Sequence, residues 1–241
     1  MSGHCSGLNL NREQLAETFK QMLYYSPLHA TIPAFIYRLQ RCSESDREIL
    51  EPFIARPPNG TDKTSIGQPK FYSWVCNESY WQPEAENEQM DDFLEQVTGH
   101  TQFAGDWAKE MNAWCDQLPS YHDVDAERFP QTDVPLLIMQ GALDPATPAS
   151  YARAWQSIVN GPHQHYVEFP YGAHNITLGT PYLNNNTITD CGLQLFVNFV
   201  QSPAAPLDTS CVNATLPPDF SGERFSTQHL GIKDLWGMDE R

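Results

Sequence analysis

The chain has 241 residues, which is enough for one large domain or two small ones. Hydrophobic residues make up 40% of it and charged residues 18%, a composition typical of a globular rather than a disordered protein. The formal net charge of −16 argues against nucleic acids and anionic membrane surfaces as partners, because both bind surfaces rich in Lys and Arg. No apolar run approaches the roughly 20 residues of a membrane-spanning helix, so we expect no membrane partner.

The first half of the chain predicts helices. In residues 11–23 apolar side chains recur on one helical face, and Asn11 with Gln14 has the spacing of a capping box. A second helix is expected to begin near Pro33 and a third at Ser45, and residues 84–118 again have helical periodicity. Residues 71–81 fit either a strand or a helix. Four tryptophans of this half fit either an apolar substrate pocket or an ordinary core: Trp74, Trp81, Trp107 and Trp114.

After residue 130 the pattern changes to alternating strands and helices, which predicts an α/β fold. The apolar run 134–141 is typical of a strand buried on both faces, and residues 165–170 predict a second strand. Between them, Thr147 and Pro148 suit the N-cap and the first residue of a helix, and a last helix is expected over 189–200. This order makes the two strands parallel, with a right-handed crossover that brings both following loops to one edge of the sheet.

Each of these two loops carries one residue suited to acid–base chemistry. Asp144 follows the first strand and His174 follows the second, where Gly172 is expected to allow a tight turn. An aspartate in this place can accept the histidine Nδ1–H, fix the tautomer of the ring and stabilise the imidazolium that forms during catalysis. The alternative is an aspartate that only closes a turn and a histidine that is only a surface residue.

Two further histidines, His163 and His165, form an H-x-H pattern that could supply two metal ligands from one strand face. The sequence places no third ligand beside them. We therefore expect no metal and no cofactor.

Cysteines and glycosylation sequons point to the secretory route. The six cysteines form no CxxC pair and no zinc-like spacing, and an even number of them suits disulfides. Residues 1–11 do not resemble a signal peptide, a conflict that disappears if the true N-terminus is missing. We expect an extracellular, secretory or lysosome-like location. Five N-x-S/T sequons are present, at Asn59, Asn77, Asn175, Asn185 and Asn213, and glycans are expected at all of them except Asn175.

Two segments of the second half resemble a known family: VPLLIMQGALDPATPASYARAW and FPYGAHN. They are similar to the last two strand–loop units of an α/β-hydrolase, within the secreted tripeptidyl aminopeptidase and prolyl aminopeptidase-like serine peptidases. Tyr171 stands where that family often has a glycine. The resemblance covers roughly residues 9–213 and is strongest over 134–215. It implies a partial α/β-hydrolase fold, with a helical lid over residues 1–125, a C-terminal hydrolase segment over 126–213 and a tail of unknown structure over 214–241.

The resemblance also implies a Ser-Asp-His triad in which Asp144 is the acid and His174 the base. The family's nucleophile lies in a G-x-S-x-G elbow, and none of the fourteen glycines belongs to such a motif; no HGGG-type oxyanion loop is present either. We therefore expect the C-terminal part of a secreted exopeptidase that acts on peptides, encoded by a truncated or split gene whose N-terminal half is its partner. The isolated chain is expected to be inactive. The alternatives are a fragment of an esterase or lipase-like hydrolase and a non-catalytic remnant.

Lid and cysteine residues complete what the resemblance implies. Glu78 is the candidate for binding the free α-amino group of a substrate, by loose similarity to the lid carboxylates of related aminopeptidases. The resemblance extends to Cys191 and Cys211, which we expect to form a disulfide. We also expect Cys76 to pair with Cys115 in the lid, and Cys5 to pair with Cys42 by elimination.

Overall fold

The structure is a computed structural model. It describes residues 10–55, 132–222 and 234–238, together with Cys5, Leu8, Lys70, 73–74, 76–77, Cys115, 117–119 and Tyr121. The chain divides into two compact units, one formed by residues 1–59 and 131–241 and the other by residues 60–130. This division differs from the expected boundaries, because the first helices and the tail after residue 213 both belong to the unit that contains the α/β segment.

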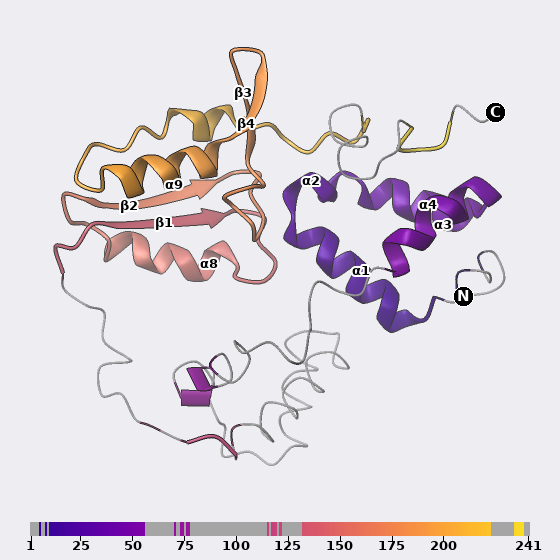
Figure 1. Ribbon diagram of the computed structural model, residues 1–241, viewed down its shortest axis with the longest axis horizontal. Helices are drawn as coiled ribbons and strands as arrows, with labels where there is room; N and C mark the ends of the chain where they lie inside the picture. The colour runs from indigo at the N-terminus through magenta and orange to yellow at the C-terminus, as the bar shows by residue number, and fades with distance from the viewer. Residues whose placement is uncertain are drawn as a thin grey trace. The chain divides into compact units, whose positions relative to one another are not determined.

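The described residues of the N-terminal part of the first unit form four helices (Figure 1). They are α1 (Arg12–Tyr24), α2 (Ser26–His29), α3 (Ile32–Arg41) and α4 (Glu44–Ala55), so α4 begins one residue before the predicted start. The capping box is confirmed, since Gln14 N donates to Asn11 Oδ1 over 2.8 Å and Asn11 N donates to Gln14 Oε1 over 3.1 Å. The core of these helices consists of Leu8, Met22, Phe35 and Leu50. A disulfide between Cys5 and Cys42 encloses the segment.

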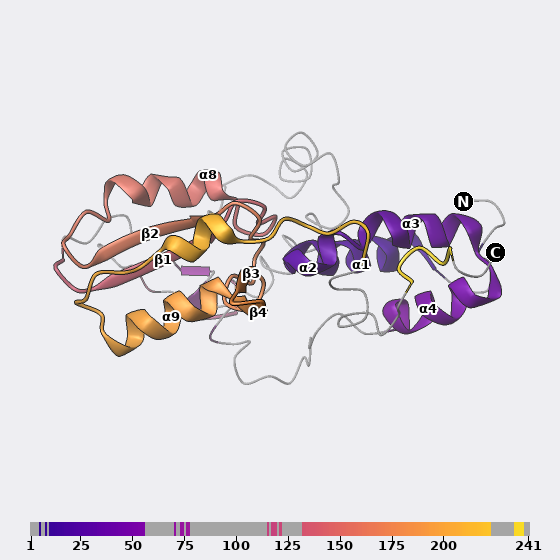
Figure 2. The ribbon, with the colours of Figure 1, turned by 90° about the horizontal axis from the view of Figure 1, so that it is seen from above.

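A parallel pair of strands forms the centre of the C-terminal part. Strand β1 (Leu136–Gly141) pairs in parallel with β2 (Gln164–Phe169), as predicted. Helices α8 (Ala149–Ala152) and α9 (Cys191–Gln201) lie on opposite sides of this pair (Figures 1 and 2). On the α9 side, Val167 and Phe169 of β2 pack with Leu195, so this layer contains the second core.

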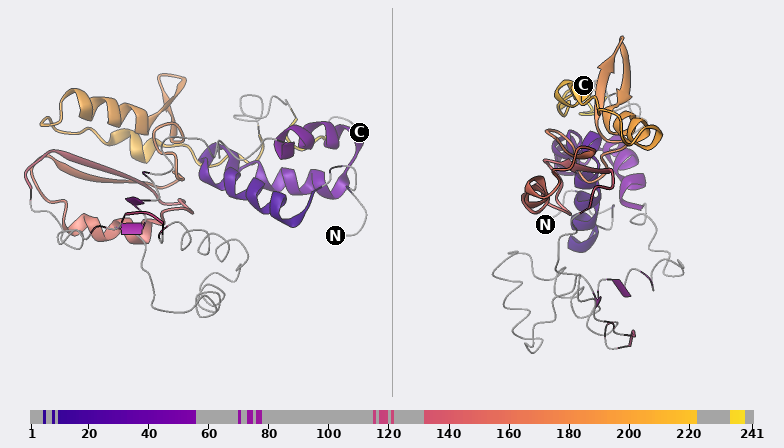
Figure 3. Two further views of the ribbon diagram at one scale, coloured as in Figure 1. Left: turned by 60° about the horizontal axis from the view of Figure 1, so that its bottom comes forward. Right: turned by 90° about the vertical axis from the view of Figure 1, so that its left-hand side faces the viewer.

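The structure corrects two predicted elements. The helix after Pro148 is short, because α8 continues as the 3-10 helix η3 (Arg153–Ser157). The last helix begins at Cys191, because residues 181–190 form a hairpin of β3 (Pro181–Asn184) and β4 (Thr187–Asp190) that projects beyond α9 (Figure 3). Its turn has positive φ angles of 47° and 63° at Asn185 and Asn186, which asparagine tolerates better than most residues.

The first strand is less buried than a strand covered on both faces would be. Leu136, at its start, is 37% exposed, and Val134 before it is 64% exposed. Among the described residues, β1 has only β2 beside it. The apolar run therefore predicted the strand correctly and its burial incorrectly.

The chain after residue 201 returns to both parts of this unit. The disulfide Cys191–Cys211 joins α9 to the 3-10 helix η4 (Ser210–Ala214), and Leu216 N donates to Pro181 O over 2.8 Å. Further on, residues 234–237 lie against α3, where Arg38 and Arg41 donate to three of their carbonyl oxygens. In the part of the chain that the structure describes, no helix is both long and apolar enough to cross a membrane.

The second unit is described at few positions. Cys76 and Cys115 form a disulfide there. Both atoms of the Asn77 side-chain amide are engaged, since Nδ2 donates to Ser73 O over 2.8 Å and Oδ1 accepts from Tyr121 N over 2.7 Å. The predicted helical range 84–118 falls almost wholly outside the described residues, as do Asn59 and Glu78.

Candidate active site

The two loops that follow β1 and β2 lie against each other at one edge of the sheet, as the strand order predicted. Ala142 N donates to Phe169 O and Leu143 N donates to Gly172 O, both over 2.9 Å. A Cβ atom on Gly172 would lie 2.9 Å from Phe169 Cβ and 3.2 Å from Gly141 Cα. Gly172 does not have a positive φ, so the absence of a side chain matters here for the close approach of two loops and not for a special turn.

This contact brings Asp144 and His174 together. The imidazole Nδ1 of His174 lies 3.0 Å from Oδ2 and 3.2 Å from Oδ1 of Asp144. The Asp144 side chain is 5% exposed, whereas that of His174 is 47% exposed. The arrangement thus has a buried carboxylate behind an imidazole that solvent or a ligand can reach. Such a carboxylate favours the tautomer with the proton on Nδ1 and leaves Nε2 as a base.

Asp144 accepts several further hydrogen bonds, which keep it ionised. The backbone N–H groups of Ala146 and Thr147 donate to Oδ1 over 2.8 and 3.0 Å, and the Thr147 hydroxyl donates to Oδ2 over 2.7 Å. Burial by itself would raise the pKa of Asp144, but the donors from Thr147, His174 and Ala146 outweigh it and lower that pKa. The carboxylate can therefore stabilise a positive charge on the adjacent imidazole.

Thr147 is a site residue that the sequence reasoning missed. We expected its hydroxyl to cap the following helix, but Pro148 is the N-cap residue and no side chain caps α8. The hydroxyl turns to Asp144 instead, and lies 3.5 Å from His174 Nδ1. A charged acceptor three residues earlier in the chain forms a stronger hydrogen bond than a helix N–H would, and this D-x-x-T spacing is the signal that was available.

The other acids near the site do not contact His174. Asp190, which was expected on the last helix, is the N-cap residue of α9 and accepts a hydrogen bond from Thr180 N over 3.1 Å. Asp133 precedes β1, at the opposite end of that strand from the site. Asp144 is therefore the carboxylate paired with His174 among the described residues.

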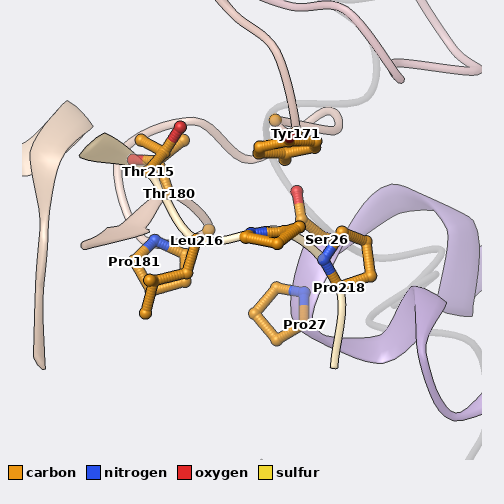
Figure 4. Close-up of a pocket in the computed structure, with 11 residues that line it drawn as sticks. Ser26, Pro27, Tyr171, Thr180, Pro181, Thr215, Leu216 and Pro218 are labelled. Carbon is orange, nitrogen blue, oxygen red and sulfur yellow. The ribbon is translucent and has the colours of Figure 1, made fainter. Parts of the chain in front are cut away.

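A small pocket lies next to the His174 loop (Figure 4). Ser26 and Tyr171 face each other across it, and the rings of Pro27, Pro181 and Pro218 line its lower part. Its volume is about 10 Å³, close to the minimum that one water molecule requires. The pocket is too small for a peptide and does not by itself indicate a substrate.

The structure describes only some of the remaining predicted site residues. Glu78 lies outside the described residues, as do Trp81, Trp107 and Trp114. Trp74 is 55% exposed, and the Lys70 ammonium lies 5.2 Å from the centre of its ring. The His165 ring packs edge-on against Phe199, and the described residues contain no group of three side chains that could hold a metal.

Comparison with known protein families gives a match in the second half of the chain. Residues 101–211 match the family model described as TAP-like protein. No curated protein and no solved structure matches the chain. The matched range includes both strands, both loops with Asp144 and His174, and the Cys191–Cys211 disulfide. Over these residues the match supports the C-terminal part of a TAP-like α/β-hydrolase.

Proposed function

We propose that this chain is the C-terminal portion of a secreted serine exopeptidase, which removes residues from the free N-terminus of peptides. The observation that carries the proposal is the hydrogen bond between His174 Nδ1 and the buried Asp144 carboxylate, at the sheet edge where both loops meet. The TAP-like match over the same residues supports a hydrolase.

In this function Asp144 and His174 act as the acid and base of a triad. The His174 Nε2 atom takes the proton of a serine hydroxyl as its oxygen attacks the peptide carbonyl carbon, and returns that proton to the leaving amine as the peptide bond breaks. A water molecule then attacks the acyl-enzyme ester, again through His174, and releases the acid product and the serine. Asp144 holds the ring in place and stabilises its positive charge in both steps.

The serine is proposed to lie outside these 241 residues. No G-x-S-x-G motif occurs in them, although the parallel pair β1–β2 with α8 and α9 fits the last units of a partial α/β-hydrolase fold. The N-terminal half of the hydrolase is then the partner of this chain. We propose the helical segments as its lid, with Glu78 binding the substrate ammonium.

Secretion is part of the proposal. Three disulfides, Cys5–Cys42, Cys76–Cys115 and Cys191–Cys211, suit an oxidising compartment. Asn185, at the turn of an exposed hairpin, and Asn213 are the described sequons whose surroundings best fit a glycan.

The test begins with the DNA upstream of the Met1 codon. A G-x-S-x-G segment in frame, or joined by splicing, is expected there, and the two halves produced together should release the chromophore from aminoacyl or tripeptidyl substrates with free N-termini. A His174→Ala variant should lose this activity, while the Glu168→Ala variant, altered at an exposed ion pair, should keep it. Glu78→Gln should raise KM for these substrates more than for N-acylated ones.

Three other results would replace or change this proposal. Cleavage of simple esters without cleavage of peptides would make the protein an esterase, since the fold does not determine the leaving group. An upstream region without a nucleophile segment would favour a non-catalytic glycoprotein, an alternative that the missing G-x-S-x-G motif supports. Peptidase activity of the isolated chain that disappears in His174→Ala would show that a serine within it is the nucleophile.

A further inference from the structure

The junction between α1 and α2 contacts the loop that carries His174. Ser26 Oγ accepts a hydrogen bond of 2.6 Å from Ala173 N, and Tyr24 O accepts one of 3.3 Å from Asn175 N. The two donors are the residues on either side of His174. The Tyr24 ring itself lies beside the imidazole, with 5.4 Å between the ring centres and 43° between the ring planes.

The hydrogen bond between Ser26 and Ala173 is shielded from water. Ala173 is fully buried and Ser26 is 6% exposed, so water does not provide a ready substitute for the hydroxyl oxygen. A buried backbone N–H without an acceptor is costly, which favours a rearranged loop over the intact one. Since the loop also approaches Gly141 closely, it has little room to move without shifting His174.

We propose that Ser26 is a positioning residue for His174. Its hydroxyl holds the backbone just before the histidine, so that the Nδ1 atom stays within hydrogen-bond distance of Asp144, while the Tyr24 ring limits the rotation of the imidazole on one side. The N-terminal helices thereby act on the acid–base pair from 147 positions away in the chain. The inference rests on the proposed function only for the role of His174 as a base.

The test uses NMR spectra of the full chain with ¹⁵N-labelled histidine, at about pH 8, where an ordinary imidazole is neutral. The His174 signals are assigned by their loss in His174→Gln. In the wild type we expect the proton on Nδ1, and we expect Ala173 N–H to be protected from hydrogen exchange. In Ser26→Ala the Ala173 N–H should exchange about tenfold faster, the change expected for the loss of its one hydrogen bond. The His174 Nδ1 proton should exchange faster as well, and the second tautomer should appear.

The control is Ser43→Ala. This variant also removes a partly buried hydroxyl, which bonds to Asp46 at the start of α4. The variant should therefore lower the stability of the protein and leave the His174 signals unchanged. Ser26→Thr keeps the hydroxyl and should keep the wild-type tautomer.

The outcomes distinguish failure of the proposed role of Ser26 from failure of the proposed function. An unchanged Nδ1 proton in a folded Ser26→Ala variant would overturn the positioning role and leave the Asp144–His174 pair intact. Rapid exchange of Ala173 N–H in the wild type would overturn it as well, even if Ser26→Ala does not fold. A wild-type His174 with its proton on Nε2 would overturn the acid–base pair itself, and with it the proposed function.

Discussion

The buried carboxylate of Asp46 offers a sharp test of how the C-terminal residues are attached to the helices. Its side chain is fully buried, and it accepts hydrogen bonds from Arg38 Nη1 over 2.8 Å and from Arg41 Nε and Nη2 over 2.8 and 2.6 Å. The same two guanidinium groups donate to the carbonyl oxygens of Asp234, Leu235 and Gly237. Asp46 thus pairs with both of the side chains that hold the tail and compensates part of their charge.

The Asp46→Ala variant removes this compensation. Arg38 is 3% exposed, so its guanidinium would remain buried without a carboxylate. Removing one partner of a buried ion pair costs about 3–5 kcal/mol, because the other charge is left unpaired. For a domain of 150–250 residues, each kcal/mol lowers Tm by about 2–4 °C, so Tm should fall by roughly 6–20 °C.

The measurement is thermal and urea unfolding with the disulfides intact, followed by the fluorescence of the tryptophans, among them Trp236 in the tail. Glu168→Ala is the matched control. Glu168 also accepts two hydrogen bonds from one arginine, over 2.7 and 3.0 Å, but that Arg153 is 56% exposed. Exposed pairs contribute about 0–1 kcal/mol. Equal losses of stability in the two variants would refute the reasoning, because burial would then have no effect.

Three other predictions follow from the same structure. Burial opposes ionisation of Asp46, but its arginine and serine donors outweigh burial and hold its pKa well below the ordinary value. The contribution of Asp46 to stability is therefore complete above about pH 4, where the unfolded aspartate ionises, and declines as the pH falls further. The wild type and Asp46→Ala should converge in stability in acid, and a constant difference between them would contradict this. The double variant Cys191→Ala, Cys211→Ala opens a loop of 20 residues and should lose about 3 kcal/mol in urea unfolding; no loss would show that native contacts alone hold this segment. Asn185→Gln, produced in eukaryotic secretory cells, should lack one glycan by mass spectrometry; an unchanged mass would mean that the hairpin turn is not modified.

Local patterns in the sequence were sufficient for the features that depend on a few neighbouring residues. The capping box of Asn11 and Gln14 spans four positions, and it forms as predicted. The strands β1 and β2 form where the sequence has apolar runs, and their parallel order places the loops of Asp144 and His174 at one edge of the sheet. These predictions succeeded because chain connectivity and side-chain periodicity leave few alternatives over such short distances.

Tertiary structure decided the features that depend on which distant groups meet. No sequence pattern indicated that Ser26 Oγ would accept a hydrogen bond from Ala173 N, or that Arg38 would donate to the carbonyl oxygen of Leu235, 197 positions later. Nor did it show that the Thr147 hydroxyl would turn to Asp144 rather than to a helix. Each of these side chains can form hydrogen bonds with several alternative partners. Which partner each side chain binds depends on which donors and acceptors become buried, away from water, when the chain packs. That burial is a property of the whole fold.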